Sequence, residues 1–161
     1  MRRLLLAFAL AASVGCAGML SLLPSPGQAD DIRQTAARVA DGIMVAEVAL
    51  DQAGAVVDAL PLSTANKDAL DCAILKVNGH DAPSPTTLKV CGPIPAFKES
   101  PVGKALTALR TVSTRPGLCA TVTAITSTLD AILAKLEAAG ASVQTARVAL
   151  GFTFQIAGGC K

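Results

Sequence analysis

The positions of the five cysteines constrain the fold of this chain more than any other feature. Cys16 lies in an apolar N-terminal leader, and the other four, Cys72, Cys91, Cys119 and Cys160, lie in the body of the chain. Without the leader an even number of cysteines remains, as two disulfides in an exported protein require. The sequence therefore predicts an oxidising compartment and a fold that is stabilised by cross-links.

The first 29 residues have the three parts of an export signal. Two arginines give a positive start, an apolar run follows, and the small residues Gly27 and Ala29 stand three residues and one residue before the expected cut. This order predicts a signal peptide over residues 1–29, with cleavage after Ala29. A single domain is then expected over residues 30–161, in the periplasm or outside the cell.

A second interpretation of the leader depends on Cys16. The run Ser13-Val14-Gly15-Cys16 is close to a bacterial lipobox, in which the cysteine is lipidated and becomes the new N-terminus. Ser13 is a poor occupant of a position that usually holds Leu or Val, so simple cleavage is favoured. A membrane-tethered lipoprotein is the alternative, and contact with a membrane is expected only if Cys16 is lipidated.

The composition argues against several classes of partner. Of the 14 basic residues, Arg2 and Arg3 lie in the leader, so 12 basic and 12 acidic residues remain in the body. A neutral body argues against general nucleic-acid binding, which depends on neutralising phosphates. The absence of Trp and Tyr argues against binding surfaces built on aromatic rings. No nucleic-acid partner is expected.

Charge is nonetheless segregated along the chain. Residues 30–58 hold six acidic residues and two arginines, whereas residues 84–161 hold eight basic and three acidic residues. We expect acidic and basic helices to neutralise one another within the fold. The alternative is a basic face that meets an anionic surface. Its residues would be Lys98, Lys104, Arg110 and Arg115.

Two segments carry long apolar stripes at helical spacing, over residues 31–60 and residues 118–139. The first stripe consists of Ile32, Ala36, Val39, Ile43, Ala46, Leu50, Ala53, Val57 and Leu60. The second consists of Leu118, Val122, Ile125, Leu129, Ile132, Leu136 and Ala139. Their alternating spacings of three and four predict two long helices in a bundle. Gly42 and Gly54 would let another helix approach the first one closely.

Local signals set the expected ends of the helices. Asp31 is the predicted N-cap of the first helix, with Gln34 at capping-box spacing. Ser63 is the predicted N-cap of a second helix that ends at Asn78. A third helix is expected to begin at Ser100-Pro101, which is a typical N-cap followed by proline at the first helical position.

Two segments are less regular. Residues 79–95 contain four prolines and are predicted to be a loop, with a brief extension at Leu88 to Val90. Residues 147–157 alternate like a strand, yet they also continue a helical stripe. The residues of that stripe are Val143, Ala146, Leu150, Thr153 and Ala157. Helix is favoured because a single strand has no partner, so the fold class is all-α, a disulfide-stapled bundle of four or five helices.

The helices suggest which cysteines pair. If residues 118–139 and 141–157 form an antiparallel hairpin about Gly140, Cys119 and Cys160 both lie at its open end, 21 and 20 positions from the turn. Cys72 then pairs with Cys91, which holds the proline-rich loop against the second helix. A metal site is not expected, because the chain has a single histidine and no Cys-x-x-Cys.

The sequence contains few candidate catalytic residues. His80 is the only histidine and precedes Asp81, so a hydrolase that uses His80 is a distant third hypothesis. No catalytic residue and no cofactor are predicted. The leading hypothesis is a non-enzymatic exported protein with a structural or protein-interaction role, through self-association or an unidentified protein partner. The alternative is a carrier of a small apolar ligand or lipid in a cavity between helices.

Overall fold

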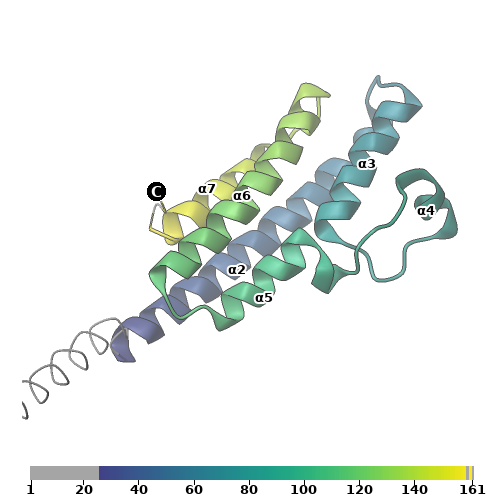
Figure 1. Ribbon diagram of the computed structural model, residues 1–161. Coiled ribbons are helices and arrows are strands. Elements are labelled where there is room, and N and C mark those ends of the chain that lie inside the picture. Colours follow the sequence, from purple (N-terminus) through teal and green to yellow (C-terminus); the bar gives the residue numbers. More distant parts are fainter. Residues whose placement is uncertain (1–25, 159, 161) are drawn as a thin grey trace, which may run out of the picture.

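The computed structural model describes residues 26–158 and residue 160 (Figure 1). Most of the expected leader, with Cys16, lies outside the described residues, so its cleavage or lipidation stays a prediction. The described part contains six α-helices and no strand. They are α2 (Pro26–Gly54), α3 (Thr64–Asn78), α4 (Pro85–Cys91), α5 (Pro101–Thr111), α6 (Arg115–Ala138) and α7 (Gln144–Ile156). Two 3₁₀ turns join them, η1 (Val57–Ala59) and η2 (Phe97–Glu99).

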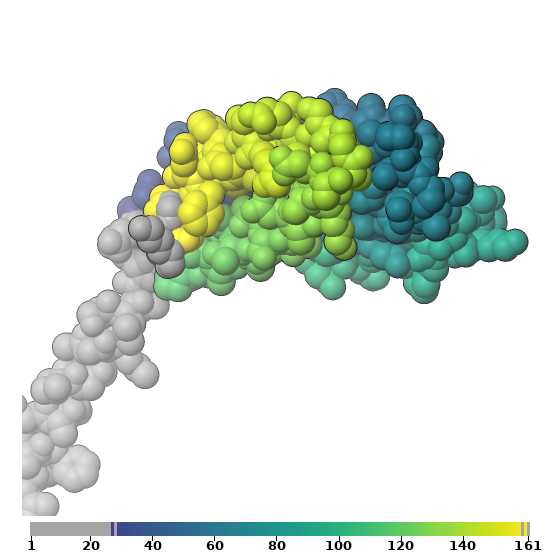
Figure 2. Space-filling model, turned by 90° about the horizontal axis from the view of Figure 1, so that it is seen from above, coloured from purple at the N-terminus to yellow at the C-terminus, as the bar shows by residue number. Residues whose placement is uncertain are grey.

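The long helices pack side by side, and α2 contacts α7, α5, α6 and α3. In Figure 1 the chain passes from α2 into α3, and α4 stands outside the bundle on the far side of α3. Figure 2 shows α3 and the segment that contains α4 at one end of the molecule, away from α7. Two disulfides join Cys72 to Cys91 and Cys119 to Cys160. The prediction of an all-α, disulfide-stapled bundle is confirmed.

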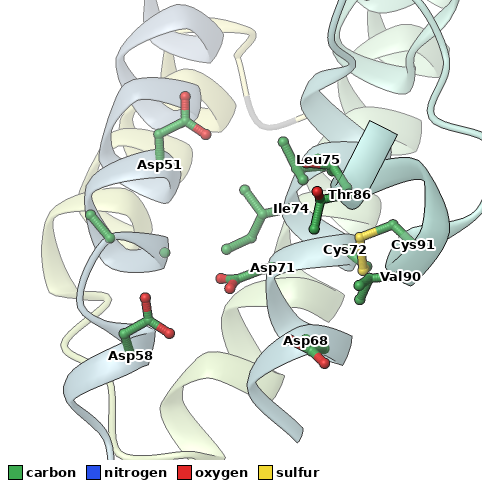
Figure 3. A pocket seen from close by; sticks show the side chains of 13 residues that line it. Asp51, Asp58, Asp68, Asp71, Cys72, Ile74, Leu75, Thr86, Val90 and Cys91 are labelled. Atoms are coloured by element: carbon green, nitrogen blue, oxygen red, sulfur yellow. A yellow bond between two sulfur atoms is a disulfide. The ribbon is translucent and has the colours of Figure 1, made fainter. Parts of the chain in front are cut away.

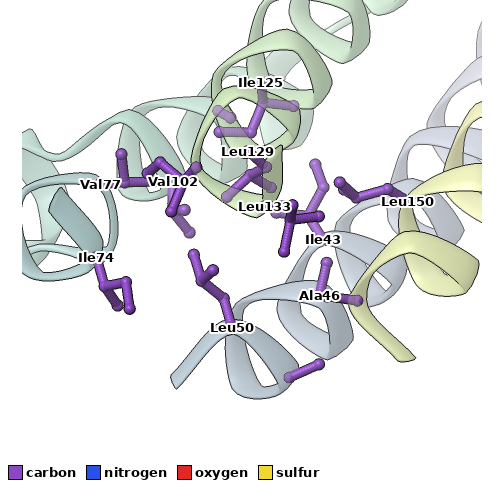
Figure 4. Close-up of a cluster of buried hydrophobic side chains, with 14 of the residues drawn as sticks. Ile43, Ala46, Leu50, Ile74, Val77, Val102, Ile125, Leu129, Leu133 and Leu150 are labelled. Carbon is purple, nitrogen blue, oxygen red and sulfur yellow. The ribbon is translucent and has the colours of Figure 1, made fainter. Parts of the chain in front are cut away.

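The two predicted apolar stripes form the centre of the core. Side chains from α2, α3, α5, α6 and α7 meet in one cluster of buried hydrophobic residues (Figure 4). Every member of the first stripe is buried except Ile32 and Leu60, and every member of the second is buried except Ala139. Burying such side chains contributes about 1.5–3 kcal/mol each for Leu, Ile or Val, so the stripes account for the bundle.

Two of the three predicted N-caps are confirmed. Ser63 accepts a hydrogen bond from the backbone N–H of Asn66 at 3.3 Å, and Ser100 accepts one from Gly103 at 3.0 Å. The prediction for Asp31 is wrong, since α2 begins at Pro26 and continues through that position. The same helix ends at Gly54, and η1 covers the last turn of the stripe.

The proline-rich segment differs from its prediction as a loop with an extended stretch at Leu88 to Val90. It contains α4, whose N-cap Ser84 accepts a hydrogen bond from the N–H of Thr87 at 3.1 Å and is followed by Pro85 at the first helical turn. This is the same Ser-Pro signal that correctly placed the start of α5. The helix therefore brings the described number of helices to six, above the four or five expected.

The ambiguous segment at residues 147–157 is helical, and the strand alternative is wrong. All five members of the expected helical stripe are buried in α7 or at its ends. Two of the residues that gave the strand-like alternation, Val148 and Phe152, are exposed instead. Gly140 forms the turn before this helix, with a φ of 94° that favours glycine.

Two glycines in α2 permit close packing, as expected from the sequence. A Cβ atom at Gly42 would lie 2.3 Å from Oγ1 of Thr153 in α7. A Cβ atom at Gly54 would lie 2.8 Å from Cδ1 of Ile74 in α3. Both distances are far below a van der Waals contact, so α7 and α3 approach α2 where it has no side chain.

Helix α6 has the length and apolar composition of a membrane span, unlike the other helices that the structure describes. Its large aliphatic side chains nevertheless all lie in the core of the bundle. The core helix of a soluble bundle has the same composition, so this match alone does not indicate a membrane.

Candidate functional site: an aspartate-lined cleft

An open cleft with a volume of about 590 Å³ lies between the end of α2, η1, α3 and α4 (Figure 3). Four aspartates line it. Asp51 belongs to α2, Asp58 to η1, and Asp68 and Asp71 to α3. None of the described residues that line the cleft is a lysine, an arginine or a histidine. The cleft therefore concentrates negative charge on one side of the molecule.

The rest of the cleft wall is mostly uncharged. Ile74 and Leu75 of α3 and Val90 of α4 provide apolar surface, and Thr86 and Thr87 of α4 add two hydroxyl groups. A charged rim beside apolar surface suits a cation with an aliphatic stem better than a neutral apolar molecule. The hypothesis of an apolar-ligand carrier stays a prediction, without specific support from the chemistry of this cleft.

Local structure sets the positions of these carboxylates. Asp68 and Asp71 are three residues apart on α3, so both lie on the same side of that helix. Figure 3 shows the carboxylates of Asp58 and Asp71 pointing toward one another from opposite sides of the cleft. The close approach of Gly54 to Ile74 brings the end of α2 against α3, and thus brings the two pairs of aspartates together.

The pKa values of two carboxyl groups, Asp71 in the cleft and Glu47 in α2, are raised. Partial burial raises the pKa of Asp71, and the charges of Asp58 and Asp68 raise it further. Burial likewise raises the pKa of Glu47, one helical turn before Asp51, whose charge adds to the effect. Desolvation and like-charge repulsion both disfavour the ionised form. A bound cation would relieve that repulsion.

Asp51 is held by a buried asparagine. Asn78 at the end of α3 is 4% exposed, and its Nδ2 donates a hydrogen bond to Oδ1 of Asp51 at 2.6 Å. The other polar atom of that amide, Oδ1, is buried without a hydrogen-bond partner among the described residues. The asparagine thus fixes the rotamer of Asp51 at the edge of the cleft.

The four carboxylates of the cleft are spread over three elements. Across residues 26–158 and 160, no three His, Cys, Asp or Glu side chains lie close enough together to hold a metal ion. Lys67 lies beside the cleft carboxylates, and its Nζ donates a hydrogen bond to the backbone oxygen of Asp58. The four carboxylates therefore present separate negative charges, which suits an extended basic partner more than a compact ion.

The four body cysteines form the pairs expected from the helical hairpin. Cys119, near the start of α6, is bonded to Cys160, four positions after the end of α7, and both cysteines lie in or against the hydrophobic core. Cys72 and Cys91 join α3 to the end of α4, and both line the cleft. Both pairings agree with those expected from the sequence. The sequence did not predict that the Cys72–Cys91 disulfide would line a cleft.

His80 lies on an exposed turn after α3. Its Nδ1 accepts a hydrogen bond from the backbone N–H of Ala82 at 3.2 Å, and Oδ1 of Asp81 accepts one from the N–H of Phe97 at 3.0 Å. In the described residues neither side chain is hydrogen-bonded to a serine or to the other. The geometry therefore gives the hydrolase hypothesis no support.

Among the described residues, no aspartate of the cleft forms an ion pair with a basic residue, although acidic and basic helices were expected to neutralise one another. The ion pairs of the described residues join Arg33 to Asp30 and Arg147 to both Asp130 and Glu137. The four residues of the hypothetical basic face, Lys98, Lys104, Arg110 and Arg115, are all exposed. The acidic cleft and these cations thus remain separately available at the surface.

A second surface feature is apolar. Met44, Val45 and Val48 of α2 and Val148 and Phe152 of α7 are each more than half exposed. A shallow groove runs beside Val45 and Val48, with Thr145 of α7 on its edge. Exposed apolar patches are common at protein contacts. Because this surface is separate from the charged cleft, it provides a position for a control substitution.

Sequence reasoning did not identify the cleft. Asp51 and Asp58 belong to the acidic segment at residues 30–58, whereas no sequence pattern singled out Asp68 and Asp71. The acidic segregation at residues 30–58 was the available signal. Comparisons of the chain with protein-family models, with curated proteins and with solved structures give no match, so the argument for function depends on this geometry.

Proposed function

We propose that this is a non-enzymatic exported protein that binds a basic segment of a partner protein in the aspartate-lined cleft. The observation that carries this proposal is the gathering of four carboxylates in one cleft that no cationic side chain lines. Electrostatic complementarity of this kind selects partners and speeds their encounter. The two disulfides are compatible with an oxidising, exported location.

The chemistry of the cleft narrows the occupant. A lysine or arginine side chain has a cationic head and an aliphatic stem, which match the carboxylates and the neighbouring apolar wall of Ile74, Leu75 and Val90. Several basic residues in a row could contact aspartates on both sides of the cleft. A peptide segment is therefore preferred to a single small cation.

Raised pKa values support the same conclusion. The pKa of Asp71 is raised by burial and by the charges of Asp58 and Asp68, so the carboxylates of the cleft repel one another. A cationic partner would stabilise the ionised carboxylates and lower that pKa. Binding is therefore expected to release protons near the pKa of Asp71 and to weaken with added salt.

Titration calorimetry with a pentalysine peptide at low ionic strength tests the proposal. The intact protein should bind it, and the double variant Asp58→Asn, Asp71→Asn should bind it about fivefold to tenfold more weakly, since each lost ion pair at a partly exposed site is worth up to about 1 kcal/mol. A neutral pentaglutamine peptide should not bind.

Two controls make the result specific. The double variant Asp31→Asn, Asp41→Asn removes two carboxylates from exposed positions of α2 outside the cleft, and should bind pentalysine nearly as the intact protein does. Val45→Ser should likewise leave that binding unchanged, because this residue lies on the separate apolar surface. Equal losses in the cleft variant and in the exposed-carboxylate variant would show only a general charge effect and would overturn the proposal.

A further inference from the structure

The segment between α3 and α5 is attached to the bundle in different ways at its base and at its tip. We refer to residues 81–96, which contain α4, as the strap. At the base, His80 N–H donates to the carbonyl of Pro95 at 2.9 Å, and Phe97 N–H donates to Oδ1 of Asp81 at 3.0 Å. At the tip, the Cys72–Cys91 disulfide joins the end of α4 to α3.

The base of the strap is also fixed by close packing. Gly79 has a φ of 78°, and a Cβ atom there would lie 2.7 Å from Cβ of Ser100 and 2.9 Å from Cα of Phe97. Ser100 is fully buried, and its hydroxyl donates to the carbonyl of Phe97 at 2.7 Å. The two ends of the strap are therefore held together whether or not the disulfide is present.

The tip has no comparable support from packing. Helix α4 has seven residues, none of which is buried, and α3 is its main neighbour. A helix this short is marginal in water without tertiary contacts. Cys72 also lies outside the hydrophobic core cluster, whereas Cys160 of the other disulfide belongs to it and Cys119 packs against it. The disulfide is therefore the main attachment of α4 to the bundle.

The same disulfide borders the cleft. Cys72 and Cys91 line it, and they also line a second open cleft, on a surface that includes Ala65, Ala69 and Lys76. The strap supplies Thr86, Thr87, Val90 and Cys91 to the wall of the aspartate-lined cleft. All four aspartates of the cleft belong to other parts of the chain. Release of the tip would remove one wall and leave the charges in place.

We propose that the Cys72–Cys91 disulfide is a redox switch that controls the aspartate-lined cleft. In the oxidised protein α4 completes the cleft, and in the reduced protein the tip of the strap detaches while its base and the bundle persist. The binding consequence rests on the function proposed above for the cleft, whereas the release of α4 does not.

The reductant is a dithiol, such as the active-site pair of a thiol–disulfide oxidoreductase. Its thiolate attacks Sγ of Cys91, the more exposed residue of the pair, and the Sγ–Sγ bond breaks with Cys72 leaving as a thiolate. The second thiol of the reductant then resolves the mixed disulfide. Cys72 and Cys91 gain two electrons and two protons in total, and the dithiol becomes a disulfide.

Hydrogen–deuterium exchange of the full chain tests the release of α4. The double variant Cys72→Ser, Cys91→Ser is compared with the intact protein, and the intact protein is also measured after partial reduction by dithiothreitol. Both treatments should speed exchange of the Leu88 and Gly92 amides, which bond within α4, by about tenfold or more, as in local opening. The core amides of α2 and α6 should stay protected.

Limited proteolysis gives a second readout of the same event. Trypsin should cleave after Lys89, in the middle of α4, much faster in the variant than in the intact protein, while Lys135 in α6 stays protected. The matched control is Cys119→Ser, Cys160→Ser, which should leave exchange within α4 unchanged. Unchanged exchange in α4 of the strap variant, or simultaneous loss of protection in α2 and α6, would overturn the switch.

Pentalysine binding separates the two proposals. The strap variant should bind the peptide roughly threefold to tenfold more weakly, because contacts to one wall are lost while the carboxylates remain. If α4 is released but binding is unchanged, the switch is overturned and the function of the cleft stands. If α4 is released but the oxidised protein binds no peptide, the proposed function fails, and the redox release of α4 stands alone.

Discussion

Gly42 of α2 lies directly against Thr153 of α7, so that a Cβ atom on the glycine would be 2.3 Å from the threonine Oγ1. Thr153 is fully buried, and its hydroxyl donates to the carbonyl of Ala149 one turn earlier in α7 at 2.8 Å. Room for a methyl group at Gly42 would therefore require this buried side chain, or α7 itself, to shift. This contact sets how closely the first and last described helices approach.

The variant Gly42→Ala should destabilise the protein by about 1–2 kcal/mol. Forcing a methyl group into a packed contact costs about 1–3 kcal/mol, and the better helix propensity of alanine offsets up to about 1 kcal/mol of it. Urea denaturation measures the change. Gly151→Ala is the matched control, because nothing lies within 4 Å of its Cβ position, and it should stabilise α7 by about 0.5–1 kcal/mol. Equal effects at the two glycines would contradict the packing argument.

The hydrogen bond from Asn78 to Asp51 should contribute measurably to stability. A hydrogen bond to a charged group contributes about 1.5–3 kcal/mol, so Asn78→Ala should lower the free energy of unfolding by about 2 kcal/mol. A double-mutant cycle with Asp51→Ala isolates the pair. A coupling energy above about 0.5 kcal/mol is expected, whereas strictly additive losses would show that the contact at 2.6 Å contributes nothing of its own.

The raised pKa of Asp71 makes stability depend on pH in a defined direction. Burial and the charges of Asp58 and Asp68 raise the pKa of this carboxyl in the folded state, so the folded protein binds its proton more tightly than the unfolded chain does. Stability from this group is fully present below the ordinary aspartate pKa of about 3.9 and is lost as pH rises through the raised pKa.

Asp71→Asn should therefore make the protein more stable than the intact chain at pH 7. At pH 3.5 the difference between the variant and the intact chain should be smaller. The gain should be no more than about 1 kcal/mol, because the group is only partly buried and solvent screens its charge. Thermal unfolding across this pH range gives the measurement. Added salt should reduce the difference at pH 7, and a variant less stable than the intact chain at pH 7 would reverse the assigned sign.

Removal of the Cys119–Cys160 disulfide should destabilise the whole bundle. The bond closes a segment with a sequence separation of 41 residues, and disulfides of this kind typically contribute about 2–4 kcal/mol. Cys119→Ala, Cys160→Ala should lower the midpoint of urea unfolding and keep a single transition. A separate early transition of α6 and α7 would show instead that the hairpin is an independent unit.

Helical periodicity was sufficient to predict the core. The stripes in α2 and α6 predicted which side chains are buried, because one repeating spacing determines which face of a long helix meets its neighbours. The pairing of Cys119 with Cys160 followed from the nearly equal lengths of the two arms about Gly140. Both predictions depend only on the regular spacing of residues along a helix, which can be read from the sequence alone.

The cleft could not be predicted in the same way. Asp51 and Asp58 belong to one segment and Asp68 and Asp71 to another, and their approach depends on the contact of Gly54 with Ile74. The sequence does not fix the angle between those segments. Helix α4 was missed for a different reason, since its Ser-Pro start was outweighed by four prolines in the surrounding segment.

The order of the two disulfides along the chain affects how they can form. The four body cysteines pair consecutively along the chain, Cys72 with Cys91 and then Cys119 with Cys160, so the two covalent rings follow one another and do not overlap. In a chain that enters an oxidising compartment from its N-terminus, Cys91 is the first partner that Cys72 meets, and the pair can close before Cys119 arrives. Entry from the N-terminus therefore lets each native disulfide form before a competing cysteine arrives. The native pairing then needs no disulfide isomerase to correct it.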